Sequence, residues 1–175
     1  MLYSVLMRIT LLVCLLSCPA LLPAQNNLKT TVTQRYFNGV RHNLEASADA
    51  MPAEKYDFKP TAGQMSFGEW LNHSTERNYS DCAALKGEPA PEAAKSVSIL
   101  KNKDEVTKAL KESLAYCAAA IDGIDDQKVL ASPQLTYSLL HTVVHNNEVY
   151  GNLAVYMRVS GIVPPSTASR MNQKK

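Results

Sequence analysis

The stretch "SPQLTYSLLHTVVHNNEVYGNLAVYMRVSG", residues 132–161, decides the fold. Ser132 is placed to cap a helix, and Pro133 suits the first helical position, where its missing N–H costs nothing. The helical pattern continues to about Ser160, and Gly161 supplies the stop. At ~1.5 Å rise per residue such a helix spans roughly 40 Å. The stretch therefore predicts one long helix of the kind that forms bundles.

Three more helical segments precede it, over about residues 29–50, 66–86 and 102–123. Ser66 with Glu69, and Asn102 with Glu105, have the spacing of a capping box, in which each residue bonds a backbone N–H of the other. No strand-like alternation of useful length is present. The sequence therefore predicts an all-α four-helix bundle. The connection of about fifteen residues between the second and third helices is long enough to carry the chain back, so that the two helices run parallel.

The N-terminal residues 1–24 have the layout of a secretory signal peptide. Arg8 precedes a short apolar run, and Ala24 provides a cleavage site. A lipoprotein processing site ending at Cys18 is a rival, but the neighbouring Leu16 and Pro19 fit it poorly. We expect an exported protein, periplasmic or secreted, rather than a lipid-anchored one. We expect the bundle to occupy residues 25–165 with no transmembrane segment, and residues 166–175 to be a tail.

The charge of the mature chain is nearly balanced. Arg8 is the only charged residue before Gln25, so 17 of the 18 basic residues face all 16 acidic ones. A net charge of +1 gives no electrostatic reason to bind nucleic acid.

Two cysteines, Cys82 and Cys117, remain after the signal peptide is removed. An exported protein can keep a disulfide, and parallel second and third helices would place the two at similar depth. However, at 100° per residue Cys82 points away from the side of its helix that carries His73. The sequence leaves a disulfide and two separate thiols both open.

A polar stripe runs along the last helix. His141, His145, Glu148 and Asn152 are spaced four, three and four, which places them in a sector of about 60°. Because the flanking residues are mostly Leu and Val, we expect the stripe to be a polar seam inside the bundle. By contrast, Asp81 on the second helix is expected to be solvated.

The stripe also has the spacing of a metal site. Imidazoles at i and i+4 can reach one ion from one helical face, and His73 on the second helix is the natural third ligand, with Glu148 as a carboxylate option. A site of this kind with open positions suits zinc, nickel or iron and can activate a bound water. The alternative is a group of core or surface histidines that hold no metal.

Three segments together resemble the DinB-like family: "MPAEKYDFKPTAGQMSFGEWLNH" (51–73), "LKESLAYCAAA" (110–120) and "HNNEVYGNLAVYMRVSGIVPPST" (145–167). The resemblance implies a four-helix bundle with up-down-down-up connectivity. It also implies a divalent metal site, with one histidine from the second helix and two, four residues apart, from the fourth.

Carried over by position, that site has His73 and His145 as two ligands and Val149 at the third position. Valine cannot bind a metal, so the triad is incomplete. His141 or Glu148 could complete an altered site, although both lie on the opposite flank of His145 from Val149. The other interpretation is that the metal has been lost.

The resemblance implies a metal-dependent hydrolase or a thiol-dependent transferase acting on a small molecule, with a metal-bound water or thiol as nucleophile. The alternative is a metal-free binding or structural module that has lost catalysis. A third interpretation takes the polar stripe as the contact of a homodimer. The sequence does not decide between an enzyme and a binding module.

Overall fold

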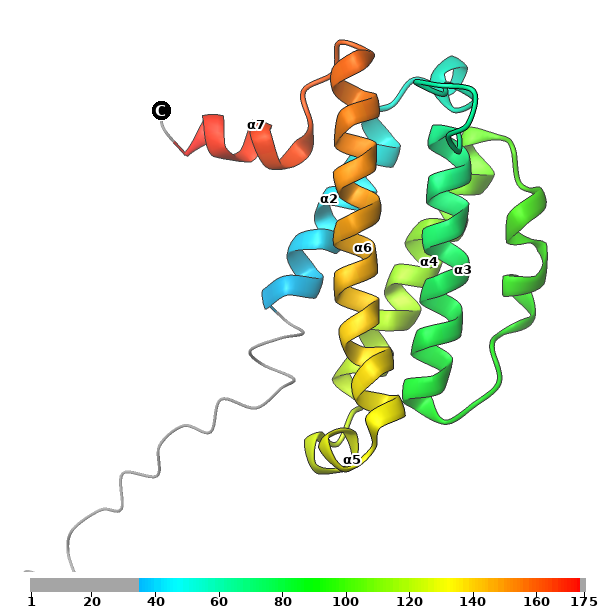
Figure 1. The fold of residues 1–175 in the computed structure, drawn as a ribbon, viewed down its shortest axis with the longest axis vertical. Helices are drawn as coiled ribbons and strands as arrows, with labels where there is room; N and C mark the ends of the chain where they lie inside the picture. Colours follow the sequence, from blue (N-terminus) through cyan, green and yellow to red (C-terminus); the bar gives the residue numbers. More distant parts are fainter. Residues whose placement is uncertain (1–34, 174–175) are drawn as a thin grey trace, which may run out of the picture.

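The computed structural model describes residues 35–173 (Figure 1). The helices of the bundle are α2 (Asn38–Ala50), α3 (Phe67–Lys86), α4 (Lys103–Asp122) and α6 (Pro133–Val159). Shorter elements are the 3₁₀ helices η2 (Ala53–Lys55) and η3 (Glu92–Ile99) and the α-helices α5 (Asp126–Ala131) and α7 (Pro165–Asn172). Residues 35–173 contain no strand, so the all-α prediction is confirmed for this part of the chain.

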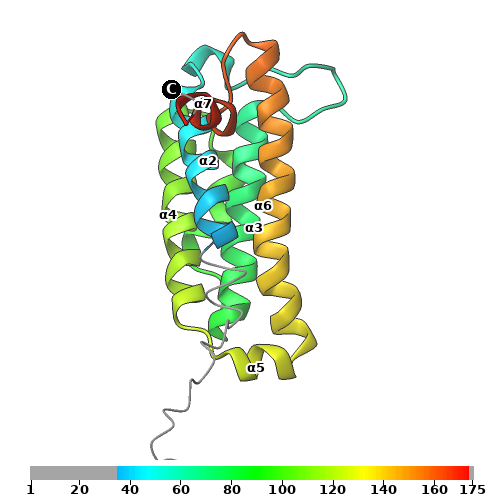
Figure 2. The same cartoon turned by 90° about the vertical axis from the view of Figure 1, so that its left-hand side faces the viewer.

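The connectivity is up-down-down-up. In Figure 1, α3 and α4 run in the same direction. The segment that connects them contains η3 and returns along the outside of the bundle, so α4 begins at the same end of the bundle as α3. Figure 2 shows the helix pair α2 and α6 running opposite to α3 and α4. Helix α3 packs against α4 and α6, and α2 packs against the same two helices. The long second connection therefore has the role predicted from its length.

The core draws on all four long helices. Its fully buried side chains include Leu44, Leu71, Leu110, Leu114, Leu153 and Met157. No helix among the described residues is both long enough and apolar enough to cross a membrane.

Local capping follows the sequence closely at α3. The Glu69 N–H donates to Ser66 Oγ at 3.2 Å, and the Ser66 N–H donates to Glu69 Oε2 at 2.7 Å, which is the expected capping box. The bond from the Ser66 N–H, together with Lys59, lowers the pKa of Glu69 to about 2. At α4 the predicted capping box of Asn102 with Glu105 is wrong. Asn102 does cap the helix, but its Oδ1 accepts from the Asp104 N–H at 2.8 Å.

The structure departs from the predicted boundary at the C-terminus and describes the N-terminal boundary only in part. The first helix is described only from Asn38, after a π-helical turn at 35–37, and residues 29–34 of its predicted range lie outside the described part. The predicted signal peptide also lies outside it. The C-terminal segment, expected as a tail, contains α7. The Tyr150 hydroxyl anchors this helix by donating to Ser166 Oγ at 2.7 Å and accepting from the Ser166 N–H at 2.9 Å.

A disulfide joins Cys82 on α3 to Cys117 on α4, with a Cα–Cα distance of 5.2 Å. Both residues are fully buried. Since the two helices run parallel and each cysteine lies about one turn before its helix ends, the two reach the same level of the bundle. This geometry decides the alternative that the sequence left open.

Candidate histidine site

Three of the four histidines meet where α3 faces α6. The ring centroids of His73 and His145 are 4.8 Å apart with planes at 80°, and those of His145 and His141 are 5.0 Å apart with planes at 8°. Trp70 lies against His73 at 6.0 Å, and Tyr137 stacks on His141 at 5.1 Å. These five residues form a continuous row of rings, here called the histidine row. The predicted gathering of His73, His141 and His145 is thus present in the structure.

A buried carboxylate orients one end of this row. His141 Nδ1 lies 2.7 Å from Asp81 Oδ2, and Arg77 donates to the other oxygen of Asp81 at 3.1 Å. Asp81 is only 4% exposed, so the expectation that it is solvated is wrong. Because Asp81 is an acceptor, it keeps the proton of His141 on Nδ1 and leaves Nε2 free for another partner.

His145 is more enclosed than His141, with side chains 12% and 23% exposed. Its Nε2 atom is buried and has no hydrogen-bond partner among the described residues. Burial, followed by the nearby His73 and His141, lowers the pKa of His145 to about 4. The ring is therefore neutral at neutral pH and carries an unprotonated nitrogen.

The rest of the predicted polar stripe is not interior. The side chain of Glu148 is 69% exposed and approaches His145 Nδ1 only to 3.8 Å, while Val149 is fully buried. Val144 and Val155, two of the flanking valines on which the expectation of an interior stripe rested, are 62% and 52% exposed. The stripe lies along the edge of the buried face of α6, so the prediction of an interior seam is wrong for Glu148.

The interior polar residues of α6 are others, centred on Asn146. Asn146 Oδ1 accepts from Ser74 Oγ at 2.6 Å, and its Nδ2 donates to Asn78 Oδ1 at 2.7 Å. Asn78 in turn donates to Ser113 on α4 at 3.1 Å, and all four residues are buried. This network ties α6 to α3 and α4 and fixes the rotation that turns His145 towards His73. The i, i+4 spacing of Ser74 and Asn78 was its only signal in the sequence.

The geometry of the row tests whether it fits a divalent ion. An imidazole binds a metal in the plane of its ring, and two imidazoles that share an ion at ~2.0–2.1 Å have ring centres about 5 Å apart. His73 and His145 meet the distance condition, because their centroids are 4.8 Å apart, and their planes cross at 80°. His141 and His145 do not fit an ion, because stacked rings with almost parallel planes share no common point.

The donor set is therefore incomplete. Within residues 35–173, no group of three His, Cys, Asp or Glu side chains could hold a metal ion. Val149, at the position that the resemblance implies for a third ligand, cannot bind a metal, and neither His141 nor Glu148 replaces it in this arrangement. The residues fit two ligands of a metal site and do not fit a three-ligand site.

Comparison with known proteins agrees with the helical fold. The family model of the DinB superfamily matches residues 36–148, which is more than half of the chain. This protein belongs to the DinB superfamily. No curated protein and no solved structure matches the chain.

Proposed function

We propose that this protein is an exported DinB-superfamily protein that binds a divalent ion (zinc, nickel or iron) through His73 and His145. The observation that carries the proposal is the buried Nε2 atom of His145, which has no hydrogen-bond partner within residues 35–173 and whose ring lies at a centroid distance of 4.8 Å from that of His73, with planes that cross. A buried polar atom without a partner is costly, and an ion between the two rings would remove that cost.

The chain supplies two imidazoles and leaves the remaining coordination positions open. When bound, the ion would lower the pKa of a water or thiol in such a position, which is the chemistry of a hydrolase or thiol transferase. Asp81 holds His141 next to this pair with its Nε2 free, so His141 can bind a polar group of a small-molecule substrate. The hydrolase-like or transferase-like reaction is proposed from membership of the family alone.

A second candidate, a metal-free binding module, is favoured by the buried Val149 and by the parallel rings of His141 and His145. In that case the half-buried row of rings is itself the surface that contacts a small ligand. Catalysis through a metal would then be lost together with the third histidine.

Metal analysis separates the two candidates. The mature protein, expressed to the periplasm without an affinity tag, is incubated with zinc, nickel or ferrous iron, desalted and analysed for metal, and its affinity is measured by calorimetry. We expect one ion per chain, lost in His73→Ala and in His145→Ala. His42→Ala is the matched control, since His42 is exposed on α2 away from the row. An intact mass that begins at Gln25 tests the export proposal.

Val149→His tests the inherited position directly. Restoring a third imidazole should raise the zinc affinity at least tenfold, provided that the melting temperature shows an intact fold. A wild-type chain that takes up no ion even in excess, and a Val149→His variant that gains none, would together reject metal binding in favour of the metal-free module.

A further inference from the structure

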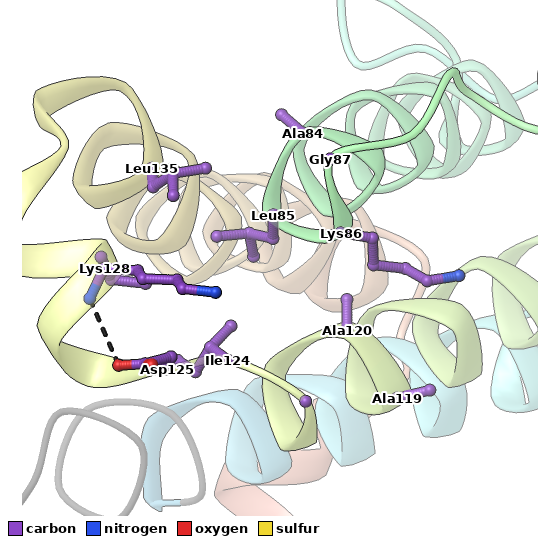
Figure 3. A pocket seen from close by; sticks show the side chains of 12 residues that line it. Ala84, Leu85, Lys86, Gly87, Ala119, Ala120, Ile124, Asp125, Lys128 and Leu135 are labelled. Atoms are coloured by element: carbon purple, nitrogen blue, oxygen red, sulfur yellow. Dashed lines mark hydrogen bonds between the residues drawn. The ribbon is translucent and has the colours of Figure 1, made fainter.

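A cleft of about 450 Å³ lies at the end of the bundle where α3 and α4 finish and where α5 and α6 begin (Figure 3). None of the residues of the histidine row lines it. Its volume is within the range of ~300–1,000 Å³ that is usual for small-molecule sites. It is therefore a second candidate site, and nothing in the proposed metal function uses it.

The walls of the cleft are mostly apolar. They consist of the ends of α3, α4, α5 and α6 and the loop between α4 and α5, with side chains Ala84, Leu85, Ala119, Ala120, Ile124, Val129 and Leu135. Leu85, Ile124 and Leu135 are only half-buried, so their free surface is available to a ligand. Covering such surface is favourable by ~25 cal/mol per Å².

The charges around the cleft are unequally satisfied. The Lys86 ammonium pairs with Glu88 and lies 4.5 Å from the ring centre of Tyr116. Asp125 uses its side chain to cap α5, accepting from the backbone N–H groups of Gln127 at 2.9 Å and Lys128 at 3.3 Å. Both of these charged side chains are therefore already engaged within the protein.

Lys128 is different. Its ammonium has no ion-pair partner in the described part of the chain, and Figure 3 shows its side chain extending across the cleft towards Leu85 and Ile124. A cation that reaches over an apolar floor is complementary to a ligand with an apolar body and one anionic group. A purely apolar ligand would leave this ammonium poorly solvated, and a cationic one would be repelled by it.

We propose that this cleft binds a small amphipathic carboxylate, with its hydrocarbon part on Leu85, Ile124 and Leu135 and its carboxylate on Lys128. The two parts of the ligand have separate roles. The apolar walls supply most of the affinity, and the single lysine selects the sign of the head group. This site shares no residue with the proposed metal site, so a negative result for one proposal does not affect the other.

The test is a titration of the full mature chain, in the presence of a chelator, with octanoate as the probe. The chemical shifts of the protein are followed by NMR. The comparison ligands are 1-octanol and octylamine, which have the same chain length as octanoate and a different head group. We expect saturable octanoate binding, with shifts at residues 84–87, 119–129 and 135. Octanol should bind about fivefold more weakly and octylamine more weakly still.

Two variants locate the interaction. Lys128→Gln should raise the Kd for octanoate about fivefold and leave that for octanol unchanged, and Ile124→Glu should weaken octanoate more than octanol. Lys95→Gln is the matched control, because Lys95 is an exposed lysine on η3 that does not line the cleft. The melting temperature of each variant shows whether the fold is kept. Equal affinity for all three ligands, shifts elsewhere, or an unchanged Kd in a folded Lys128→Gln variant would overturn the proposal.

Discussion

Removing the Cys82–Cys117 disulfide should lower the free energy of unfolding by about 4 kcal/mol. The bond closes a loop with a sequence separation of 35 residues. In the chain-entropy model, a loop of that size removes about 13 cal/mol/K from the unfolded state, or about 3.8 kcal/mol at 25 °C. A domain is typically stable by only ~5–15 kcal/mol, so this one bond is a large part of the total.

The assay is urea denaturation of three samples: the oxidised protein, the same protein reduced under denaturing conditions and refolded with a reductant, and the Cys82→Ala/Cys117→Ala double variant. The reduced sample keeps both sulfur atoms, and therefore separates loop entropy from the loss of packing at two fully buried positions. We expect the reduced protein to lose about 4 kcal/mol and the double variant somewhat more, because it also leaves small cavities.

The reasoning would be refuted by a reduced protein whose stability lies within about 1 kcal/mol of the oxidised form. It would also be refuted by an intact mass that shows two free thiols in protein purified from an oxidising compartment. A change in the urea m-value alone would instead indicate a more expanded unfolded state, which is what loss of the cross-link predicts.

Three other predictions concern His145, the N-cap of α3 and the buried hydrogen bonds of Asn146. Folding lowers the pKa of His145 from 6.5 to about 4, so as the pH falls, His145 binds a proton in the unfolded chain before it does so in the folded chain. The stability of the metal-free protein should therefore fall between about pH 6.5 and pH 4, and urea midpoints should show a smaller fall in His145→Gln; equal falls would contradict this. Ser66→Ala removes an N-cap and should cost about 1 kcal/mol, whereas Ser80→Ala, exposed on the same helix, should cost almost nothing. Asn146→Ala should cost about 2–3 kcal/mol by leaving buried partners unpaired, against less than about 0.5 kcal/mol for the exposed Asn147→Ala. Equal losses within either matched pair would show that the bonds at Ser66 or Asn146 do not stabilise the fold.

The helices and their order were accessible from the sequence because their signals are local. Ser132 accepts from the Leu135 N–H at 3.3 Å with Pro133 at the first helical position, and Gly161 follows the end of α6 with a φ of 79°. Each of these interactions joins residues within one helical turn. The long link before α4 also indicated parallel helices, because chain length limits where the next helix can begin.

The candidate site was only partly accessible. The i, i+4 spacing placed His141 and His145 on one face and indicated His73 as a third ligand, and the family resemblance pointed to position 149. Neither the spacing nor the resemblance indicated that Asp81 is buried beneath His141, or that Glu148 and Val144 face outwards. Periodicity defines which residues share a face, but it does not define how far a helix is rotated about its axis.

By itself, then, the sequence determined the all-α bundle, most helix boundaries and the superfamily. The tertiary structure decided the disulfide, the helices at α5 and α7, and which side of α6 is buried. The physical reason is that caps and turns depend on neighbours along the chain. The rotation of α6 depends instead on the core and on the contacts of Asn146 with two other helices, which become definite only when all four helices are packed.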